Sequence, residues 1–218
     1  MPRLFDLIAF DWDGTLFDST AIIARSIQAA VRDVGGAVPS DRLAKHVIGL
    51  GLNQALAMAA PDVAPERYRE LGERYRQHYM ARQDELFLFA GILDLLAELR
   101  QRGHLLAVAT GKSRRGLDAV LRSSNLDQTF AATRTADETA GKPDPRMLLE
   151  LMDELGVPPQ RALMVGDTSH DLQMARNAGC TGVAVSYGAH EPADLHALQP
   201  AFIAHSVDDF RRWILAQG

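Results

Sequence analysis

Residues 7–16, Leu-Ile-Ala-Phe-Asp-Trp-Asp-Gly-Thr-Leu, place a short apolar run directly before two carboxylates. The run Leu7–Phe10 is typical of a buried strand, and Gly14 indicates the turn that ends it. Open α/β sheets bind ligands at the carboxyl ends of their strands, so Asp11 and Asp13 are expected at a binding edge. Two carboxylates this close repel each other unless a cation lies between them, and Mg²⁺ prefers such oxygen ligands. For the pair alone, an ordinary acidic turn is the alternative, because Asp-Gly is common in turns.

Two later apolar runs also end in polar residues. Residues 105–109 stop at Thr110-Gly111-Lys112-Ser113, and residues 162–165 lead into Gly166-Asp167-Thr168-Ser169-His170-Asp171. Between them, a loop-forming segment holds one lysine in Gly141-Lys142-Pro143-Asp144-Pro145. The chain has only three lysines, at positions 45, 112 and 142, and two of them fall inside these segments. This repeated arrangement of groups able to bind phosphate or a metal is more specific than any one of its parts.

Strand-like and helical patterns alternate along much of the chain. Strands are predicted at residues 4–10, 105–109, 162–165 and 182–185. Apolar residues recur at helical spacing over 92–99, 147–155 and 172–178, and these stretches are followed by helix-ending glycines at 103, 156 and 179. The alternation predicts an α/β fold, with a Rossmann-like three-layer core whose central parallel sheet is covered by helices on both faces.

The stretch between Thr15 and about residue 90 carries no strand signal. Ser19 is a candidate N-cap of a helix that runs through Val34, and residues 66–82 suggest a longer charged helix. We therefore expect an α/β catalytic core of residues 1–18 and 88–218, and an inserted all-helical domain of residues 19–87. Such a lid can cover a site and exclude water. The alternative, that these helices only extend the core, is weaker because they interrupt the alternation of strands and helices.

The four motif segments, in this order, resemble the signature of the haloacid dehalogenase superfamily, in its phosphatase branch. The run from Asp11 to Ser19 is similar to the family's nucleophile motif nearly residue for residue, and residues 108–121 and 166–179 resemble phosphoglycolate phosphatases and their close relatives. The resemblance is least specific over residues 21–85, and the helical insertion as a whole looks like the cap domain of these phosphatases. Two positions depart from the pattern: Gly111 stands where Asn is frequent, and Ala90 where Pro is common.

The resemblance implies a Mg²⁺-dependent phosphatase that hydrolyses a small phosphate monoester through an aspartyl-phosphate intermediate. Asp11 would be the nucleophile, and Asp13 would protonate the leaving oxygen and then take a proton from water. The side chains of Asp11 and Asp167, with the backbone carbonyl of Asp13, would hold the metal. Asp171, four residues after Asp167 and on the same face if a helix starts there, would hold the metal's water ligands or orient Lys142.

The same resemblance implies which residues bind the phosphate. Lys142 would balance the charge of the nucleophile and of the transferred group, and Thr110 would offer its hydroxyl. The amides of Gly111 and Lys112 lie near the expected start of a helix, where free N–H groups bind anions. Gly14 would let the loop approach the phosphate closely. The side chain of Lys112 is equally well explained as a solvated residue early in that helix.

Selection of the substrate is expected in the helical insertion. Arg42, Lys45 and His46 are candidates for binding the carboxylate of a small substrate such as phosphoglycolate, and the alternative for each is a solvated helix face. Two residues of the motifs are expected to take no part in the reaction. His170 is expected to point to solvent, and Trp12 to pack on the opposite side of the strand end from the aspartates.

Phosphoglycolate is the leading substrate because the resemblance extends over almost the whole chain. A sugar-phosphate mutase and a pyrophosphatase of the same superfamily are the alternatives. The dehalogenases and phosphonatases of the superfamily fit less well, because they typically lack an acid at the place of Asp13. Two alternatives involve no catalysis. A phospho-receiver domain is much shorter and carries its phosphoacceptor in mid-chain, and an inactive binding relative would usually have lost an acid or the lysine.

Composition argues against several other classes of protein. With 218 residues the chain can bury a substantial core, and its net charge of −5 argues against a binder of nucleic acid or of a membrane surface. Its start lacks a signal-peptide pattern, no apolar run approaches the ~20 residues of a membrane span, and the single cysteine cannot form an internal disulfide. We therefore expect a cytoplasmic protein whose partner is a small phosphorylated metabolite; its oligomeric state stays open.

Overall fold

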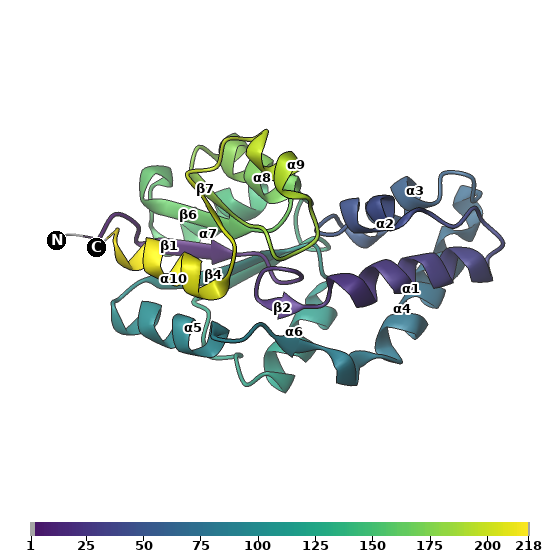
Figure 1. Cartoon of the computed structure of the whole chain (residues 1–218), viewed down its shortest axis with the longest axis horizontal. Coiled ribbons are helices and arrows are strands. Elements are labelled where there is room, and N and C mark those ends of the chain that lie inside the picture. Colours follow the sequence, from purple (N-terminus) through teal and green to yellow (C-terminus); the bar gives the residue numbers. More distant parts are fainter. Residues whose placement is uncertain (1–2, 218) are drawn as a thin grey trace.

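A six-stranded parallel sheet forms the centre of the computed structural model, which describes residues 3–217 (Figure 1). The strand order is β5-β4-β1-β6-β7-β8, and the chain crosses over on both sides of β1, which is where open α/β sheets bind ligands. The predicted α/β fold with a parallel sheet is confirmed. The strands are β1 (Leu7–Phe10), β4 (Leu105–Thr110), β5 (Ala132–Thr135), β6 (Ala162–Gly166), β7 (Thr181–Val185) and β8 (Phe202–Ala204).

The strands on either side of β1 run in register with it. Phe10 lies opposite Val108 of β4 and Val165 of β6, and the N–H of Asp11 continues the ladder to the carbonyl oxygen of Val165 at 2.9 Å. The carboxyl ends of parallel strands point the same way, so the polar segments that follow β1, β4 and β6 meet at one edge of the sheet. The register therefore assembles the motifs that lie far apart in the sequence.

Helices cover both faces of the sheet, which confirms the three-layer prediction. Ile8 and Phe10 pack in one cluster with apolar side chains of α5 (Ile92–Gln101), α6 (Arg114–Ser123) and α10 (Val207–Leu215). Leu7 and Ala9 point to the other face, against α7 (Arg146–Leu155) and α8 (Ser169–Ala178). This alternation follows from the two-residue period of a strand. The remaining short elements of this part are the 3₁₀ turn η3 (Pro159–Arg161) and the helix α9 (Pro192–His196).

Two strands, β5 and β8, lie outside the predicted set. Both form the edges of the sheet; β5 reads Ala-Thr-Arg-Thr, and β8 has only 3 residues. An edge strand has a neighbour on one side only and is often short or polar, which weakens its apolar signal. The predicted glycine stops are confirmed, because Gly156 and Gly179 adopt the left-handed conformation at the ends of α7 and α8.

The residues between β1 and α5 form a helical unit that lies beyond the carboxyl ends of the strands (Figure 1). Its apolar side chains, among them Ile27, Leu56 and Leu71, form a hydrophobic cluster separate from those of the sheet. On this ground we propose residues 19–87 as a domain of its own, inserted into a core of residues 1–18 and 88–218. Its elements are α1 (Thr20–Asp33), α2 (Asp41–His46), α3 (Leu52–Ala59), η1 (Pro65–Arg67), α4 (Tyr68–Met80) and η2 (Gln83–Glu85).

The prediction that this stretch contains no strand is wrong at its two ends. β2 (Phe17–Asp18) and β3 (Phe87–Leu88) pair antiparallel where the chain enters and leaves the helical unit. Each has 2 residues, too few for a period to show in the sequence. Their pairing holds together the two segments that connect the helical unit to the rest of the chain.

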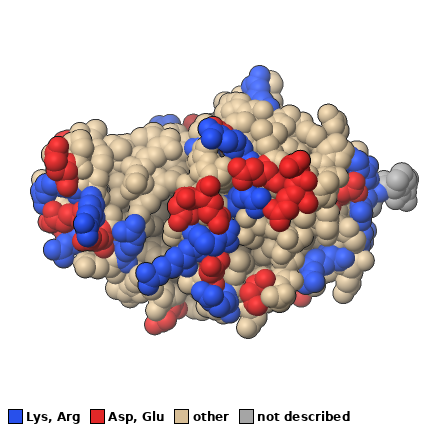
Figure 2. Space-filling view, turned by 180° about the vertical axis from the view of Figure 1, so that it is seen from behind, with Lys and Arg blue, Asp and Glu red and all other residues tan. Residues whose placement is uncertain are grey.

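The surface is mixed in charge. On the face drawn in Figure 2, Lys and Arg side chains are interspersed with Asp and Glu side chains. This face therefore carries no continuous basic surface of the kind that binds a phosphate backbone. Within residues 3–217, no helix is both long and apolar enough to cross a lipid bilayer.

Candidate active site

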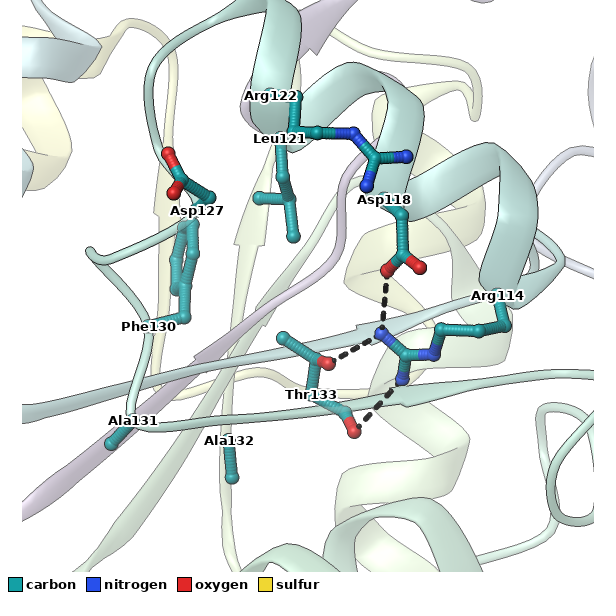
Figure 3. Close-up of a pocket in the computed structure, with 9 residues that line it drawn as sticks. All are labelled: Arg114, Asp118, Leu121, Arg122, Asp127, Phe130, Ala131, Ala132 and Thr133. Carbon is teal, nitrogen blue, oxygen red and sulfur yellow. Dashed lines mark hydrogen bonds and ion pairs between the residues drawn. The ribbon is translucent and has the colours of Figure 1, made fainter.

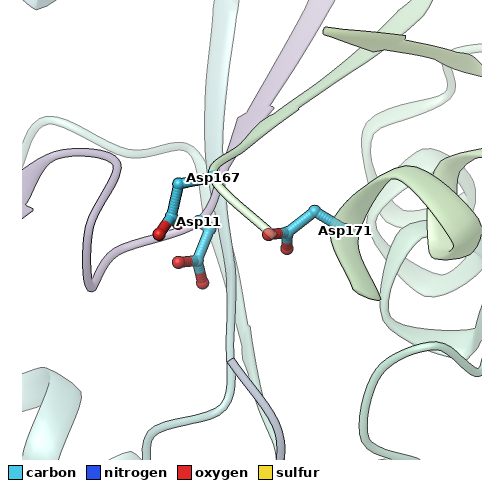
Figure 4. A group of neighbouring side chains, drawn as sticks. All are labelled: Asp11, Asp167 and Asp171. Atoms are coloured by element: carbon cyan, nitrogen blue, oxygen red, sulfur yellow. The ribbon is translucent and has the colours of Figure 1, made fainter. Parts of the chain in front are cut away.

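Three buried aspartates meet at the edge of the sheet where β1 and β6 end (Figure 4). Asp11 follows β1, Asp167 follows β6, and Asp171 lies in the first turn of α8. One carboxylate oxygen of each lies within 4.8 Å of the others, and all three residues are fully buried. Thr168 fixes Asp171 through a capping box, in which the Asp171 Oδ2 accepts from the Thr168 N–H (3.1 Å) and hydroxyl (2.7 Å).

Lys142 supplies the positive charge of this cluster. Its Nζ lies 2.5 Å from Asp11 Oδ1 and 2.7 Å from Asp171 Oδ1, and the residue is fully buried. Burial disfavours the charged form, but the carboxylates of Asp11 and Asp171 outweigh it and hold the pKa of Lys142 above its usual range. Lys142 is therefore an ammonium, and it joins two of the three carboxylates.

The cluster holds more negative charge than Lys142 can balance. Burial raises the pKa of Asp11 to about 7 although Lys142 opposes it, and burial with repulsion from Asp11 and Asp171 raises the pKa of Asp167. With all three carboxyls ionised, one ammonium would leave a charge of −2, and the raised pKa values of Asp11 and Asp167 express the cost of that charge. Among the described residues, Asp11 Oδ2 is buried without a hydrogen-bond partner. An oxygen-lined, doubly negative cluster with an unpartnered oxygen fits a divalent cation such as Mg²⁺.

Asp167 is held from several sides. Its Oδ1 accepts a hydrogen bond from the Thr15 hydroxyl (2.9 Å), and its Oδ2 accepts one from the Ala189 N–H (2.7 Å). A Cβ atom at Gly14 or at Gly188 would overlap the Asp167 carboxylate, and Gly14 has a φ of +88°, which other residues rarely adopt. Gly14, which was expected to face a phosphate, thus packs directly against a site carboxylate.

Asp13 lies beside the cluster with partners of its own. The Ser19 hydroxyl donates to Asp13 Oδ1 (2.7 Å), and the Lys112 Nζ lies 2.9 Å from Asp13 Oδ2. Ser19 does occupy the N-cap position of α1, but its side chain makes no capping bond because its hydroxyl turns to Asp13. Lys112 is not a solvated residue, since its side chain is only 12% exposed and is paired. Trp12, between the two aspartates, is fully buried against Phe17, as predicted.

The loop after β4 meets the helical unit at Gly111. A Cβ atom there would lie 2.5 Å from the carbonyl oxygens of both Gly49 and Leu50. The helical unit thus lies directly against the predicted phosphate-binding loop, and an Asn side chain at position 111 would not fit this arrangement. In the same loop, the buried hydroxyl of Thr110 accepts a hydrogen bond from the Lys112 N–H (3.2 Å).

Three histidines form a second contact between the helical unit and the sheet. The Nε2 atoms of His170 and His190 lie 2.8 Å and 3.0 Å from one carbonyl oxygen, that of His46 at the end of α2. The Ser169 N–H donates to the Nδ1 of His190 (3.0 Å), so neutral His190 carries its proton on Nε2, facing His46. Burial lowers the pKa of both His170 and His190. The prediction that His170 points to solvent is wrong, and no local pattern in the sequence marks His190.

Arg42 and Lys45, the other candidates for substrate selection, line a surface cleft together with Glu191 and Asp194. The Arg42 guanidinium lies 3.9 Å from Asp194, and its side chain is 82% exposed. Within residues 3–217, the charged neighbours of these two cations are the acids of this cleft and not the three buried aspartates.

A further cleft lies between α6 and β5 (Figure 3). Arg114 spans it and donates to Asp118, to the Thr133 hydroxyl (2.8 Å) and to Glu138 (2.6 Å). Arg114 is therefore satisfied by its neighbours in this cleft, whereas Asp11 keeps a buried oxygen without a partner. We place the candidate active site at the aspartate cluster for this reason.

The fold is that of an α/β enzyme, and its candidate active site consists of carboxylates and one buried lysine at the strand ends. The family model of the haloacid dehalogenase-like hydrolases matches residues 8–185. The chain belongs to this family of hydrolases, as the four motifs predict.

Individual relatives span more than one activity. The phosphoglycolate phosphatase of Aliivibrio fischeri is 32% identical over 214 residues, which cover 94% of this chain and 93% of that protein. The tyrosine-protein kinase PtkA of Mycobacterium tuberculosis is 34% identical over 212 residues, which cover 94% of this chain and 71% of that protein. The crystal structure of a predicted phosphoglycolate phosphatase from Haemophilus somnus has a TM-score of 0.85 at 26% identity, and the match covers 98% of this chain and 99% of that one.

Proposed function

We propose that the chain is a Mg²⁺-dependent phosphatase that hydrolyses a small phosphorylated metabolite through an aspartyl-phosphate. The observation that carries this proposal is the buried pair of Asp11 and Lys142 beside Asp167 and Asp171. Hydrolysis of a phosphate monoester is among the slowest uncatalysed reactions, and it is accelerated chiefly by positioning and by balancing charge. Phosphoglycolate is the leading substrate, supported by the similarity to the phosphatase of A. fischeri.

Asp11 is the proposed nucleophile. The Asp11 carboxylate, which is paired with Lys142 through Oδ1, would attack phosphorus through one of its oxygens. The bond from phosphorus to the leaving oxygen breaks as the bond to Asp11 forms, and Lys142 balances the charge of the transferred group. Water then releases phosphate from Asp11.

Asp13 is proposed to protonate the leaving oxygen and later to take a proton from the attacking water. Ser19 and Lys112 hold its two carboxylate oxygens, which restricts its orientation. Thr110 and the Gly111 N–H would bind the phosphate. The backbone of the helical unit, which lies against Gly111, would keep bulk water from the intermediate.

The side chains of Asp11 and Asp167, with the backbone carbonyl of Asp13, would hold Mg²⁺. When bound, the metal would neutralise charge on the carboxylates and on the phosphoryl oxygens. Asp171 is bonded to Thr168 through one oxygen and paired with Lys142 through the other, so its proposed role is to keep the lysine in position.

The test measures phosphate release from a panel of phosphorylated metabolites, with Mg²⁺ and with a chelator. We expect the wild type to hydrolyse phosphoglycolate only when Mg²⁺ is present. Asp11→Asn should lower kcat by about 10⁴-fold or more, because the amide is a poor nucleophile, while the unfolding temperature stays close to that of the wild type. Asp94→Asn, at an exposed position of α5, is the matched control and should keep full activity. Full turnover by Asp11→Asn, or in the presence of chelator, contradicts the proposal.

A further inference from the structure

The Lys112 ammonium bridges the sheet and the helical unit. Its Nζ lies 2.9 Å from Asp13 Oδ2 and donates to the hydroxyl of Tyr79, on α4, at 3.2 Å. The same Nζ lies 5.0 Å from the centre of the Tyr79 ring, within the range of a cation–π contact. Tyr79 in turn stacks on Tyr75, one turn earlier on α4. Lys112 is therefore held between the proposed acid of the reaction and an aromatic wall of the helical unit.

This ammonium is charged and has a donor to spare. Burial works against its charge, but the Asp13 carboxylate opposes this effect, and the pKa of Lys112 is held above its usual range. An ammonium has three N–H donors, and within residues 3–217 the acceptors that surround Lys112 Nζ are Asp13 and Tyr79. An N–H donor that is buried without an acceptor costs free energy. An anionic oxygen of a ligand would supply that acceptor and would therefore bind well there.

The position of Lys112 indicates which part of a substrate would meet it. Asp13 is the proposed acid for the leaving oxygen, so the leaving group must lie against Asp13. The Lys112 Nζ, 2.9 Å from Asp13 Oδ2, is then next to the atoms that follow the ester oxygen. Arg42 and Lys45, by contrast, lie in a cleft lined by acids.

We propose that Lys112, held in place by Tyr79, binds a carboxylate on the leaving part of the substrate and so selects short phosphorylated hydroxy acids. The inference rests on the proposed phosphatase function and adds the residue that chooses among phosphate monoesters. In a phosphorylated 2-hydroxy acid such as phosphoglycolate, a single carbon separates the carboxylate from the ester oxygen. This short spacing suits an ammonium that also contacts Asp13, the proposed acid for that oxygen. The Tyr79 ring, whose centre lies 5.0 Å from the Lys112 Nζ, would limit the length of the leaving group.

The test compares kcat/KM for phosphoglycolate and for its amide, in which a neutral carboxamide replaces the carboxylate. The wild type should prefer the acid, and Lys112→Gln and Lys112→Met should lower this preference by about 10–100-fold. Using the ratio of the two esters cancels any loss that arises because Asp13 is less well held. Lys112→Arg should keep most of the preference. Tyr79→Phe, which keeps the ring but loses the hydroxyl, should lower the preference less than Lys112→Gln does.

Arg115→Met is the matched control, since it removes one cation from an exposed position of the same helix, α6, and should leave the preference unchanged. Equal losses on the two esters in the Lys112 variants would show that Lys112 only holds Asp13, and would overturn the inference. So would a loss of preference in Arg42→Met or Lys45→Met with none in the Lys112 variants. If Lys112→Gln and Lys112→Met do not fold, two other results decide. The inference is overturned if the wild type does not prefer phosphoglycolate over its amide, or if Tyr79→Phe leaves that preference unchanged. A wild type that hydrolyses neither ester, nor any other phosphate monoester, instead refutes the phosphatase function itself.

Discussion

At the level of single side chains, the site is governed by the cost of burying charge. An ionised carboxylate taken out of water must be paired and hydrogen-bonded, and here Lys142 pairs with Asp11 and Asp171. Asp167 has no cation of its own in this set and is held by Thr15 and the Ala189 N–H. If a metal binds as proposed, Asp167 is therefore the carboxylate that would depend most on it for charge balance.

We expect Asp167→Asn to weaken Mg²⁺ binding by at least the ~10–100-fold that loss of a metal's supporting group causes. The amide keeps the size and one oxygen of the side chain but removes the charge. Activity should therefore recover in part as the Mg²⁺ concentration is raised, which a titration of turnover against the metal measures. Asp11→Asn should show no such recovery, because it removes the nucleophile. Equal metal dependence in Asp167→Asn and the wild type would exclude Asp167 as a ligand.

At the level of helices and strands, Arg114 joins α6 to β5 and to the loop that follows. Its guanidinium donates to the Thr133 hydroxyl (2.8 Å) and to Glu138 (2.6 Å). The hydrogen bond from Arg114 is the main reason that the pKa of Glu138 falls from 4.5 to about 2. Because the folded state lowers this pKa, ionised Glu138 stabilises the fold fully above about pH 4.5, and this contribution is lost as the pH falls toward 2.

We expect Glu138→Gln to lower the free energy of unfolding at pH 7 by less than about 1 kcal/mol, since Glu138 is exposed and solvent screens the pair. At pH 2.5 the variant and the wild type should differ less than at pH 7, because the carboxyl of the wild type is then partly protonated. Urea unfolding at the two pH values measures the difference. A gap between the two proteins that stays the same at both pH values would show that Glu138 acts through packing and not through its charge.

At the level of the whole molecule, several contacts besides that of Lys112 with Tyr79 fasten the helical unit to the sheet. The β2–β3 pair joins the two connecting segments, the His46 carbonyl oxygen faces two imidazole Nε2 atoms, and the backbone of Gly49 and Leu50 lies against Gly111. Of these, the contact at Gly111 lies within the proposed phosphate-binding loop itself. This contact also tolerates an added side-chain atom least, because two backbone carbonyls cannot move aside as a flexible side chain can.

We expect Gly111→Ala to displace the helical unit and to destabilise the fold by about 1–3 kcal/mol, the usual cost of overpacking. Small-angle scattering should report a larger radius of gyration, and turnover should fall because water is less well excluded. Gly72→Ala makes the same chemical change inside α4, where a Cβ meets only ordinary contacts. That control should stabilise the protein by up to about 1 kcal/mol. A compact, fully active Gly111→Ala variant would show that the closed arrangement is not needed for activity.

Some parts of the structure could be predicted from the sequence and others could not, for physical reasons. Central strands such as β1 carry continuous apolar runs because both of their faces are buried, so they were found, whereas the polar edge strand β5 was not. Within the candidate site, Asp11, Asp167 and Lys142 could be proposed from the sequence because each lies in a motif with a distinctive local pattern. Ser19 was assigned to the wrong partner, because an N-cap position is a local feature and its bond to Asp13 is not.

The order of residues alone accounts for the chemical groups of this protein and for the edge of the sheet at which they gather, because strand period, glycine stops and parallel register are short-range properties. Folding of the helical unit onto the sheet decides which group contacts which. It brings Lys112 to Tyr79 across 33 positions and His190 to His46 across 144. These contacts depend on how two separately packed parts of the chain fit together, and a pattern within a few neighbouring residues cannot encode such a fit.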